Sequence, residues 1–192
     1  MHMTNKHPNP LKVITGPDTR MSYLNVLQPK SINGGLPKYS VSLIIPKSDT
    51  RTVTKIRSAI EAAYREGEAK LRGSGHSLPP LESIKLPLRD GDAERPTDPV
   101  YANAFFMNAN SNTKPGVVDA NCQPILDASE IYSGIYGRAS VSFYAYNSNG
   151  SRGIACSLNN LKKLRDGEHL GGKPSAEEDF SIDDDDDENF LF

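Results

Sequence analysis

The stretch Arg138-Ala139-Ser140-Val141-Ser142-Phe143-Tyr144-Ala145-Tyr146 carries the clearest structural pattern in the chain. Small and apolar residues occupy every second position, and polar or aromatic residues occupy the positions between them. Because successive side chains of a strand point to opposite faces, this alternation predicts a half-buried β-strand. A run dense in turn residues follows from Asn147 to Gly153, so residues 154–161 are predicted to return as the hairpin partner.

The other predicted elements complete a chain that is mainly β. Strands are predicted at 20–27, 39–45 and 100–108, with short ones at 116–119 and 124–126. In the second of these, Tyr39, Val41, Leu43 and Ile45 are expected to share one face. One long helix is predicted from Thr52 to Leu71, with Ser48, Asp49 and Thr50 as candidate N-caps. Residues 73–99 predict a long loop with one short extended piece at 84–88.

This set of elements is typical of a small OB-fold-like barrel of mixed type. Several short strands, one helix, two long loops and a hairpin fit the strand count of such a barrel. OB folds commonly bind single-stranded nucleic acid or oligosaccharide. Strand count alone leaves other small β-rich domains open.

Charge is distributed unevenly along the chain. The full chain carries 22 Lys and Arg against 24 Asp and Glu, a net charge of −2. Residues 1–176 hold all 22 basic side chains and 15 acidic ones, a net charge of +7. A basic body with an acidic tail is typical of nucleic-acid binding with an interaction tail, although a merely solubilising tail gives the same pattern.

The tail ends in a hydrophobic tip, which favours a docking role over simple solubilisation. We expect one domain over residues 1–166, followed by a flexible linker and acidic tail over 167–192, because so acidic a stretch cannot bury enough apolar area to fold. The tail residues expected to bind partner proteins are Asp183, Asp184, Asp185, Asp186, Asp187, Glu188, Phe190 and Phe192.

Several functional classes find no support in the sequence. Neither a secretory signal segment nor an apolar run of about 20 residues is evident, so we expect a protein of the host-cell cytoplasm that has no membrane partner. Cys122 and Cys156 form no CxxC pair and are expected to be free. The acidic run from Asp90 to Glu94 lacks the further ligands of a calcium loop. We therefore predict no catalytic residues, no metal and no cofactor.

The polar face of residues 138–146 offers a surface suited to single strands. Bases stack on aromatic rings and phosphates meet arginine or lysine in sequence-tolerant binding of this kind. An alternative is that Tyr144 and Tyr146 pack beneath a loop or the helix. The full set of predicted DNA-binding residues is Arg138, Tyr144, Tyr146, Arg152, Tyr136, Tyr101, Phe105, Lys162 and Lys163.

Five segments resemble, in order, a family of bacteriophage proteins. They are residues 37–47, 87–92, 113–119, 135–139 and 153–160. The family, formerly a domain of unknown function, comprises phage single-stranded-DNA-binding proteins, and the resemblance spans roughly residues 11–180. It implies an OB-fold core, single-stranded-DNA binding and a part in phage replication or recombination, but no residue-level site. The tail also resembles those of replicative single-strand-binding proteins, without their usual Pro-Phe ending.

Two functions are therefore predicted, from different classes. The first is a non-enzymatic, sequence-tolerant protein that coats single-stranded DNA and recruits phage or host replication and recombination proteins through its tail. The alternative is an acidic-tailed interaction factor or chaperone that does not bind DNA. A metal-dependent nuclease is a distant third alternative. The oligomeric state stays open, and a homo-oligomer is among the alternatives.

Overall fold

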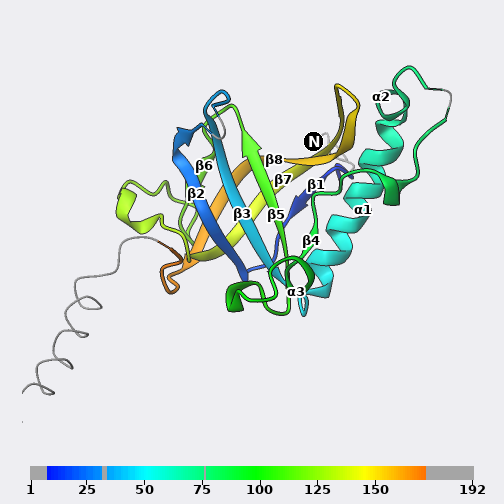
Figure 1. Ribbon diagram of the computed structural model, residues 1–192. Coiled ribbons are helices and arrows are strands. Elements are labelled where there is room, and N and C mark those ends of the chain that lie inside the picture. The colour runs from blue at the N-terminus through cyan, green and yellow to red at the C-terminus, as the bar shows by residue number, and fades with distance from the viewer. Residues whose placement is uncertain (1–7, 32–33, 76, 172–192) are drawn as a thin grey trace, which may run out of the picture.

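Strand β7 (Tyr136–Ser148) joins the two halves of the sheet. It pairs antiparallel with β1 (Lys12–Ile14), β2 (Thr19–Lys30) and β8 (Ser151–Arg165). Beyond β2 the sheet continues through β3 (Lys38–Pro46) to β5 (Ala104–Ser111), which meets β8 in parallel. Strands β2, β3, β5, β8 and β7 thus close a barrel in the computed structural model, which describes residues 8–31, 34–75 and 77–171 (Figure 1). This confirms the predicted barrel.

The barrel interior is filled by the alternating positions that the sequence predicted for β7. Ala139, Val141, Phe143 and Ala145 are all buried, as are Val41, Leu43 and Ile45 of β3. Tyr39 is only half-buried, and Ile44 is buried on the opposite face of β3, where a second, smaller cluster covers it. The predicted face of β3 is therefore correct for three residues, and its outer face is partly covered as well.

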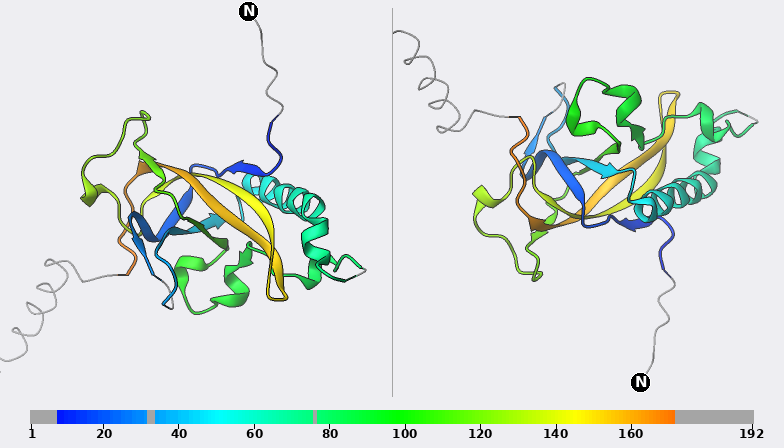
Figure 2. Two further views of the ribbon diagram at one scale, coloured as in Figure 1. Left: turned by 90° about the horizontal axis from the view of Figure 1, so that it is seen from above. Right: turned by 90° about the horizontal axis from the view of Figure 1, so that it is seen from below.

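The predicted helix is present but divided in two. Helix α1 (Thr50–Glu66) packs beside β1 and β7, and α2 (Glu68–Arg72) follows after Gly67 (Figure 2). Of the three candidate caps, Asp49 is the one used, and its Oδ1 accepts a hydrogen bond from the Thr52 backbone at 3.1 Å. The division falls at Gly67, where a β-carbon would overlap that of Ala145 on β7. Close packing against the barrel thus requires glycine, which the helical pattern did not show.

The segment between α2 and β5 contains more structure than the predicted loop. It holds η1 (Leu81–Ser83), β4 (Arg89–Asp90), α3 (Gly91–Glu94) and η2 (Pro99–Tyr101). Lys85, within the predicted extended piece, pairs in parallel with Gly153. The strand predicted from residue 100 begins only at Ala104, because residues 99–101 form a 3₁₀ turn after the Asp98 cap. Tyr101, Ala104, Phe106 and Ile44 form the smaller cluster against the outside of the barrel.

The remaining elements lie at the ends of the barrel. Strand β6 (Gly116–Val118) pairs in parallel with β8, Pro124 makes an isolated bridge to Val118, and η3 (Ala128–Glu130) precedes β7. The β7–β8 turn is tighter than predicted, because pairing continues to Ser148 and Ser151 and only Asn149 and Gly150 make the turn. Both have positive φ, which suits the Asn-Gly pair. Within the described ranges, no helix is long and apolar enough to cross a membrane.

Candidate nucleic-acid interface

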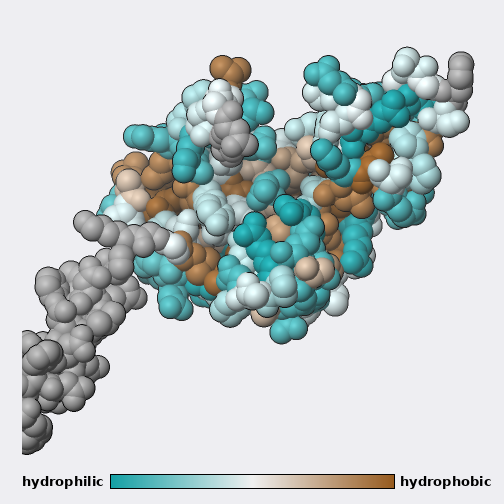
Figure 3. Space-filling model, viewed as in Figure 1, coloured by the Kyte–Doolittle hydropathy of each residue, from teal (hydrophilic) through white to brown (hydrophobic). Residues whose placement is uncertain are grey.

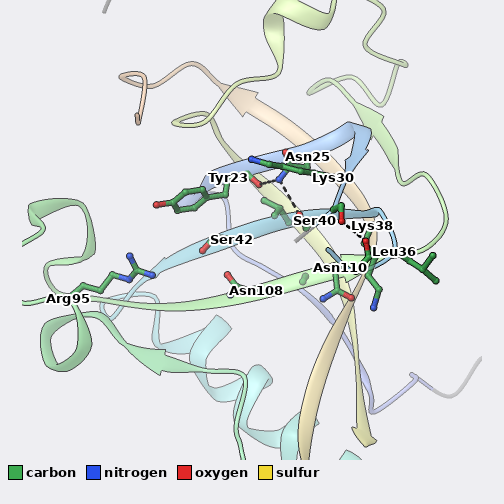
Figure 4. A pocket seen from close by; sticks show the side chains of 14 residues that line it. Tyr23, Asn25, Lys30, Leu36, Lys38, Ser40, Ser42, Arg95, Asn108 and Asn110 are labelled. Atoms are coloured by element: carbon green, nitrogen blue, oxygen red, sulfur yellow. Dashed lines mark hydrogen bonds between the residues drawn. The ribbon is translucent and has the colours of Figure 1, made fainter. Parts of the chain in front are cut away.

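A groove of about 920 Å³ runs along the outer face of β2, β3 and β5 (Figure 4). Its volume lies within the range of about 300–1,000 Å³ that is usual for ligand pockets. In Figure 3 this side of the molecule is a mosaic of hydrophilic and hydrophobic residues. The residues that shape the groove include Tyr23, Asn25, Lys30, Leu36, Lys38, Ser40, Ser42, Arg95, Asn108 and Asn110.

The floor of the groove is a ladder of short, uncharged polar side chains. Ser40 lies opposite Asn110, and Ser42 lies opposite Asn108, in the antiparallel register of β3 and β5. Their neighbours Met107 and Ala109 are fully buried in the barrel, so alternation turns Asn108 and Asn110 outward. The floor therefore offers hydroxyl and amide groups, which both donate and accept hydrogen bonds.

Tyr23 stands at the β2 side of the groove in an unusual backbone conformation. The β2–β3 register shifts between Ser22 and Asn25, and Tyr23 within this bulge has φ of 48°. Few non-glycine residues adopt such values, and strained positions cluster at functional sites. The Asn25 amide holds the bulge by donating to the Tyr23 carbonyl at 3.1 Å and to Ser40 Oγ at 3.2 Å. The Tyr23 side chain is 64% exposed, which makes it a ring on which a base can stack.

Arg95 is held at another side of the groove by aromatic rings. Its guanidinium carbon lies 4.8 Å from the centre of the Tyr101 ring and 5.2 Å from that of Phe106. These two rings pack edge to face at 5.1 Å, and burial raises the pKa of the Tyr101 hydroxyl. Cation–π contacts of this kind restrain an otherwise flexible side chain. Arg95 is thereby held with its charge at the groove.

Two lysines supply positive charge at the hairpin end of the groove. Lys30 and Lys38 are register partners across β2 and β3, and both are exposed. The charged groups that line the groove are thus Lys30, Lys38 and Arg95, while the floor itself is neutral. A polyanion with uncharged bases suits this arrangement, with phosphates near the cations and bases over the floor.

Of the predicted binding residues, Tyr144 lies on the surface that continues from this groove. It is 44% exposed and follows two positions after Ser142, which is paired with Ser157 of β8. Ser157 in turn is paired with Asn110 of the groove floor. Tyr146 faces the same side but is half-buried, and a β-carbon at Gly153 would lie 2.8 Å from its hydroxyl. Burial raises the pKa of the Tyr144 hydroxyl.

The structure distributes the other predicted residues over several places. Tyr136 is enclosed between Arg20 and Arg165, whose guanidinium carbons lie 5.2 and 4.2 Å from its ring centre. Nearby, Lys163 donates to the Glu130 carbonyl at 2.7 Å. Lys162 Nζ lies 3.3 Å from Cys122 Sγ, and Arg138 Nε donates to the Thr15 carbonyl at 2.9 Å. Arg152 and Phe105 are half-buried, and Tyr101 is 3% exposed.

The predicted set therefore does not form one cluster. The rings of Tyr101 and Tyr136 are largely engaged by neighbouring side chains, which leaves Tyr144 as the most accessible predicted ring. Sequence reasoning did not single out Tyr23 or the two asparagines of the floor, and it gave Arg95 only as one of several basic candidates in the long loop. Asn108 and Asn110 had a readable signal, since they alternate with Met107 and Ala109. The bulge at Tyr23 had none. The predicted tail residues lie outside the described ranges.

The acidic run after β4 has a structural role. Lys47 Nζ lies 2.8 Å from both Asp90 Oδ1 and Asp92 Oδ2, and these contacts lower the pKa of both carboxyl groups. Asp92 Oδ1 also accepts a hydrogen bond from the Asn103 backbone at 2.9 Å. Among the described residues, no three His, Cys, Asp or Glu side chains gather as metal ligands would. The run joins β3 to the segment that carries Arg95.

The barrel topology and the placement of the groove define an OB-type binding fold. In OB folds the face of the second and third strands, with the loops beside it, binds oligonucleotides or oligosaccharides. Here β3 and β5 occupy those places, and the groove lies on their outer face. A family model described as the ssDNA-binding protein of Enterobacter phage Enc34 matches residues 11–191. The chain therefore belongs to this family of phage single-stranded-DNA-binding proteins.

Individual proteins and structures are also similar to this chain. A putative protein, p50, of Acyrthosiphon pisum secondary endosymbiont phage 1 is 30% identical over 167 residues, covering 84% of this chain and 89% of p50. The single-stranded-DNA-binding protein of bacteriophage Enc34, solved in complex with ssDNA, superposes with a TM-score of 0.70 at 24% identity, covering 84% of this chain and 90% of that one. The single-stranded-DNA-binding protein gp2.5 of bacteriophage T7 has a TM-score of 0.59 at 17% identity, covering 88% and 93%. These structural likenesses support the fold.

Proposed function

We propose that this protein coats single-stranded DNA during phage replication or recombination, without marked sequence preference and without catalysis. The observation that carries the proposal is the groove on the β3–β5 face, with an exposed ring at Tyr23, cations beside it and a neutral polar floor. The family, and the ssDNA complex of the Enc34 protein, support the choice of ligand. The net charge of +7 over residues 1–176 favours binding of a polyanion.

We further propose that the bound strand continues from the groove across β8 toward Tyr144. Ser157 and Ser142 bridge the groove floor and this ring on one outer face. The remaining predicted contacts, from Arg138, Tyr146, Arg152, Tyr136, Phe105, Lys162 and Lys163, are proposals of the same kind. The buried ring of Tyr101 supports Arg95 rather than offering a face to a base.

A titration with labelled oligonucleotides tests the proposal. We expect single strands to bind much more tightly than duplex of the same length, because paired bases cannot stack on protein rings. The logarithm of the affinity is expected to fall with that of the salt concentration, by about 0.7 for each phosphate neutralised. Equal affinity for both forms, or a flat salt response, would contradict DNA coating and favour the alternative of a protein-interaction factor.

We also propose that the acidic tail competes with DNA and recruits replication or recombination proteins through its tip. The tail carries nine acidic side chains over residues 177–192, and a tethered polyanion reaches effective concentrations of about millimolar. Deleting 177–192 is expected to tighten DNA binding. Deleting only Phe190, Leu191 and Phe192 leaves the acids in place, so partner capture is expected to fail while competition persists. Unchanged DNA affinity after the full deletion argues against competition, and capture that survives the tip deletion argues against docking.

A further inference from the structure

The asparagines of the groove floor differ from other asparagines on the barrel. Asn25 and Asn159 are each tied to serine hydroxyls, Asn25 to Ser40 at 3.2 Å and Asn159 to Ser142 at 2.9 Å. By contrast, no hydrogen bond within the described ranges engages the side-chain amide of Asn108 or Asn110. Both amides line the groove, and the residues that alternate with them on β5, Met107 and Ala109, are fully buried. Their backbone is held within the sheet, and their amide groups make no hydrogen bond to the described residues.

The charges around the floor decide which part of a nucleotide reaches these amides. The lining cations lie around the floor, Arg95 on its aromatic support and Lys30 and Lys38 at the hairpin end. Phosphates are expected near those cations, which leaves the bases above the neutral ladder. Figure 4 shows the Tyr23 ring and the Arg95 side chain extending beside Ser42 and Asn108 of the floor. A base stacked on the Tyr23 ring would therefore lie next to this stretch of floor.

We propose that Asn108 and Asn110 hydrogen-bond to the Watson–Crick edges of unpaired bases. This inference rests on the proposed function and deepens it. A carboxamide presents a donor and an acceptor side by side. Every nucleobase also presents an adjacent donor and acceptor on its Watson–Crick edge, for example N3–H and O4 of thymine. Rotation of the amide by half a turn exchanges its two groups, so the same asparagine matches all four bases.

This arrangement accounts for two properties at once. Sequence tolerance follows because a rotating amide or hydroxyl has no fixed preference for one base. Selectivity for single strands follows because the Watson–Crick edges are occupied in a duplex, whereas unpaired bases expose them to side chains. Hydrogen bonding at the floor would thus favour single strands over duplex, and stacking on Tyr23 would add to this preference.

A chemically blocked oligonucleotide tests the inference directly. We compare oligothymidylate of about 16 nucleotides, the upper end of an OB-fold site, with the same strand built from N3-methylthymidine. Methylation removes the N3–H donor but keeps the sugar, the phosphates and a flat base. Wild-type protein is expected to bind the methylated strand at least about tenfold more weakly, since each lost amide contact weakens binding about threefold to tenfold.

The matched variants locate the effect. In the double variant Asn108→Ala/Asn110→Ala, affinity for oligothymidylate falls, and the difference between the two strands largely disappears. Asn121→Ala, an exposed asparagine that does not line the groove, retains the wild-type difference and controls for loss of an amide as such. Circular dichroism verifies that each variant is folded.

The possible failures are distinguishable. If wild type binds both strands tightly and equally, the edge-reading inference is wrong and DNA binding stands. If the double variant discriminates against the methylated strand as strongly as wild type does, the edges are read elsewhere and the assignment to Asn108 and Asn110 is wrong. If wild type binds neither strand, the proposed function itself fails.

Discussion

Replacing Tyr23 by alanine separates a binding role from a structural one. The ring is 64% exposed, so its removal takes little apolar surface out of the folded core. Alanine also keeps the strained backbone at φ of 48°, because both residues bear a β-carbon. We therefore expect the free energy of unfolding to change by less than about 0.5 kcal/mol, the usual range for surface substitutions.

The expected loss of DNA binding is much larger. Stacking of a base on an aromatic ring contributes about 1–3 kcal/mol. Since about 1.4 kcal/mol corresponds to a factor of ten, Tyr23→Ala should weaken single-strand binding by about 5-fold to 150-fold. Tyr23→Phe keeps the ring and is expected to retain affinity within about twofold, because stacking needs only the aromatic face.

Fluorescence anisotropy with a labelled oligonucleotide measures both affinities, and urea unfolding measures stability. Tyr23→Gly adds a second check, because glycine adopts positive φ without strain. It should lose DNA binding as alanine does, yet be at least as stable as the alanine variant. An alanine variant that binds DNA within about twofold of wild type would refute the stacking role of Tyr23. Weak binding by the phenylalanine variant would show that the hydroxyl, rather than the ring, carries the contact.

Two further predictions concern the barrel itself. Burial raises the pKa of the Cys156 thiol to about 12, whereas Cys122 is exposed. A thiol reagent at about pH 8 should therefore label one cysteine in the native protein and two in denaturant. Two fast-reacting thiols in the native protein would contradict the burial of Cys156. Lys47→Met should lower stability at neutral pH, as urea unfolding measures, because Asp90 and Asp92 lose their partner. Lys47 lowers the pKa of both carboxyl groups below the ordinary 3.8, so this stabilisation is present above that pH and is lost as the pH falls through the lowered values. A stability difference between variant and wild type that persists undiminished well below pH 3.8 would contradict this role of Lys47.

Local patterning predicted much of the barrel. Alternation in residues 138–146 identified the buried side of β7 correctly, because a two-residue period and burial on one face are properties of a single strand. The helix was likewise readable, and its Asp49 cap was one of three candidates, since capping depends on residues close in sequence. The same alternation in β5 contained the outward positions of Asn108 and Asn110, although their place in a groove depends on β3, which pairs beside them.

What only the tertiary structure decided are the features that depend on distant segments. Glycine is required at position 67, where the helix divides, because Ala145, far along the chain, leaves no room for a β-carbon. Arg95 became part of the groove because Tyr101 and Phe106 pack beneath its guanidinium group. The sequence by itself determined the main strands, the buried face of β7 and the charge asymmetry, all of which depend on neighbours in the chain. The groove lies where three strands and a loop meet. The residues that line it therefore follow no common periodic pattern in the sequence, and only closure of the barrel brings them together.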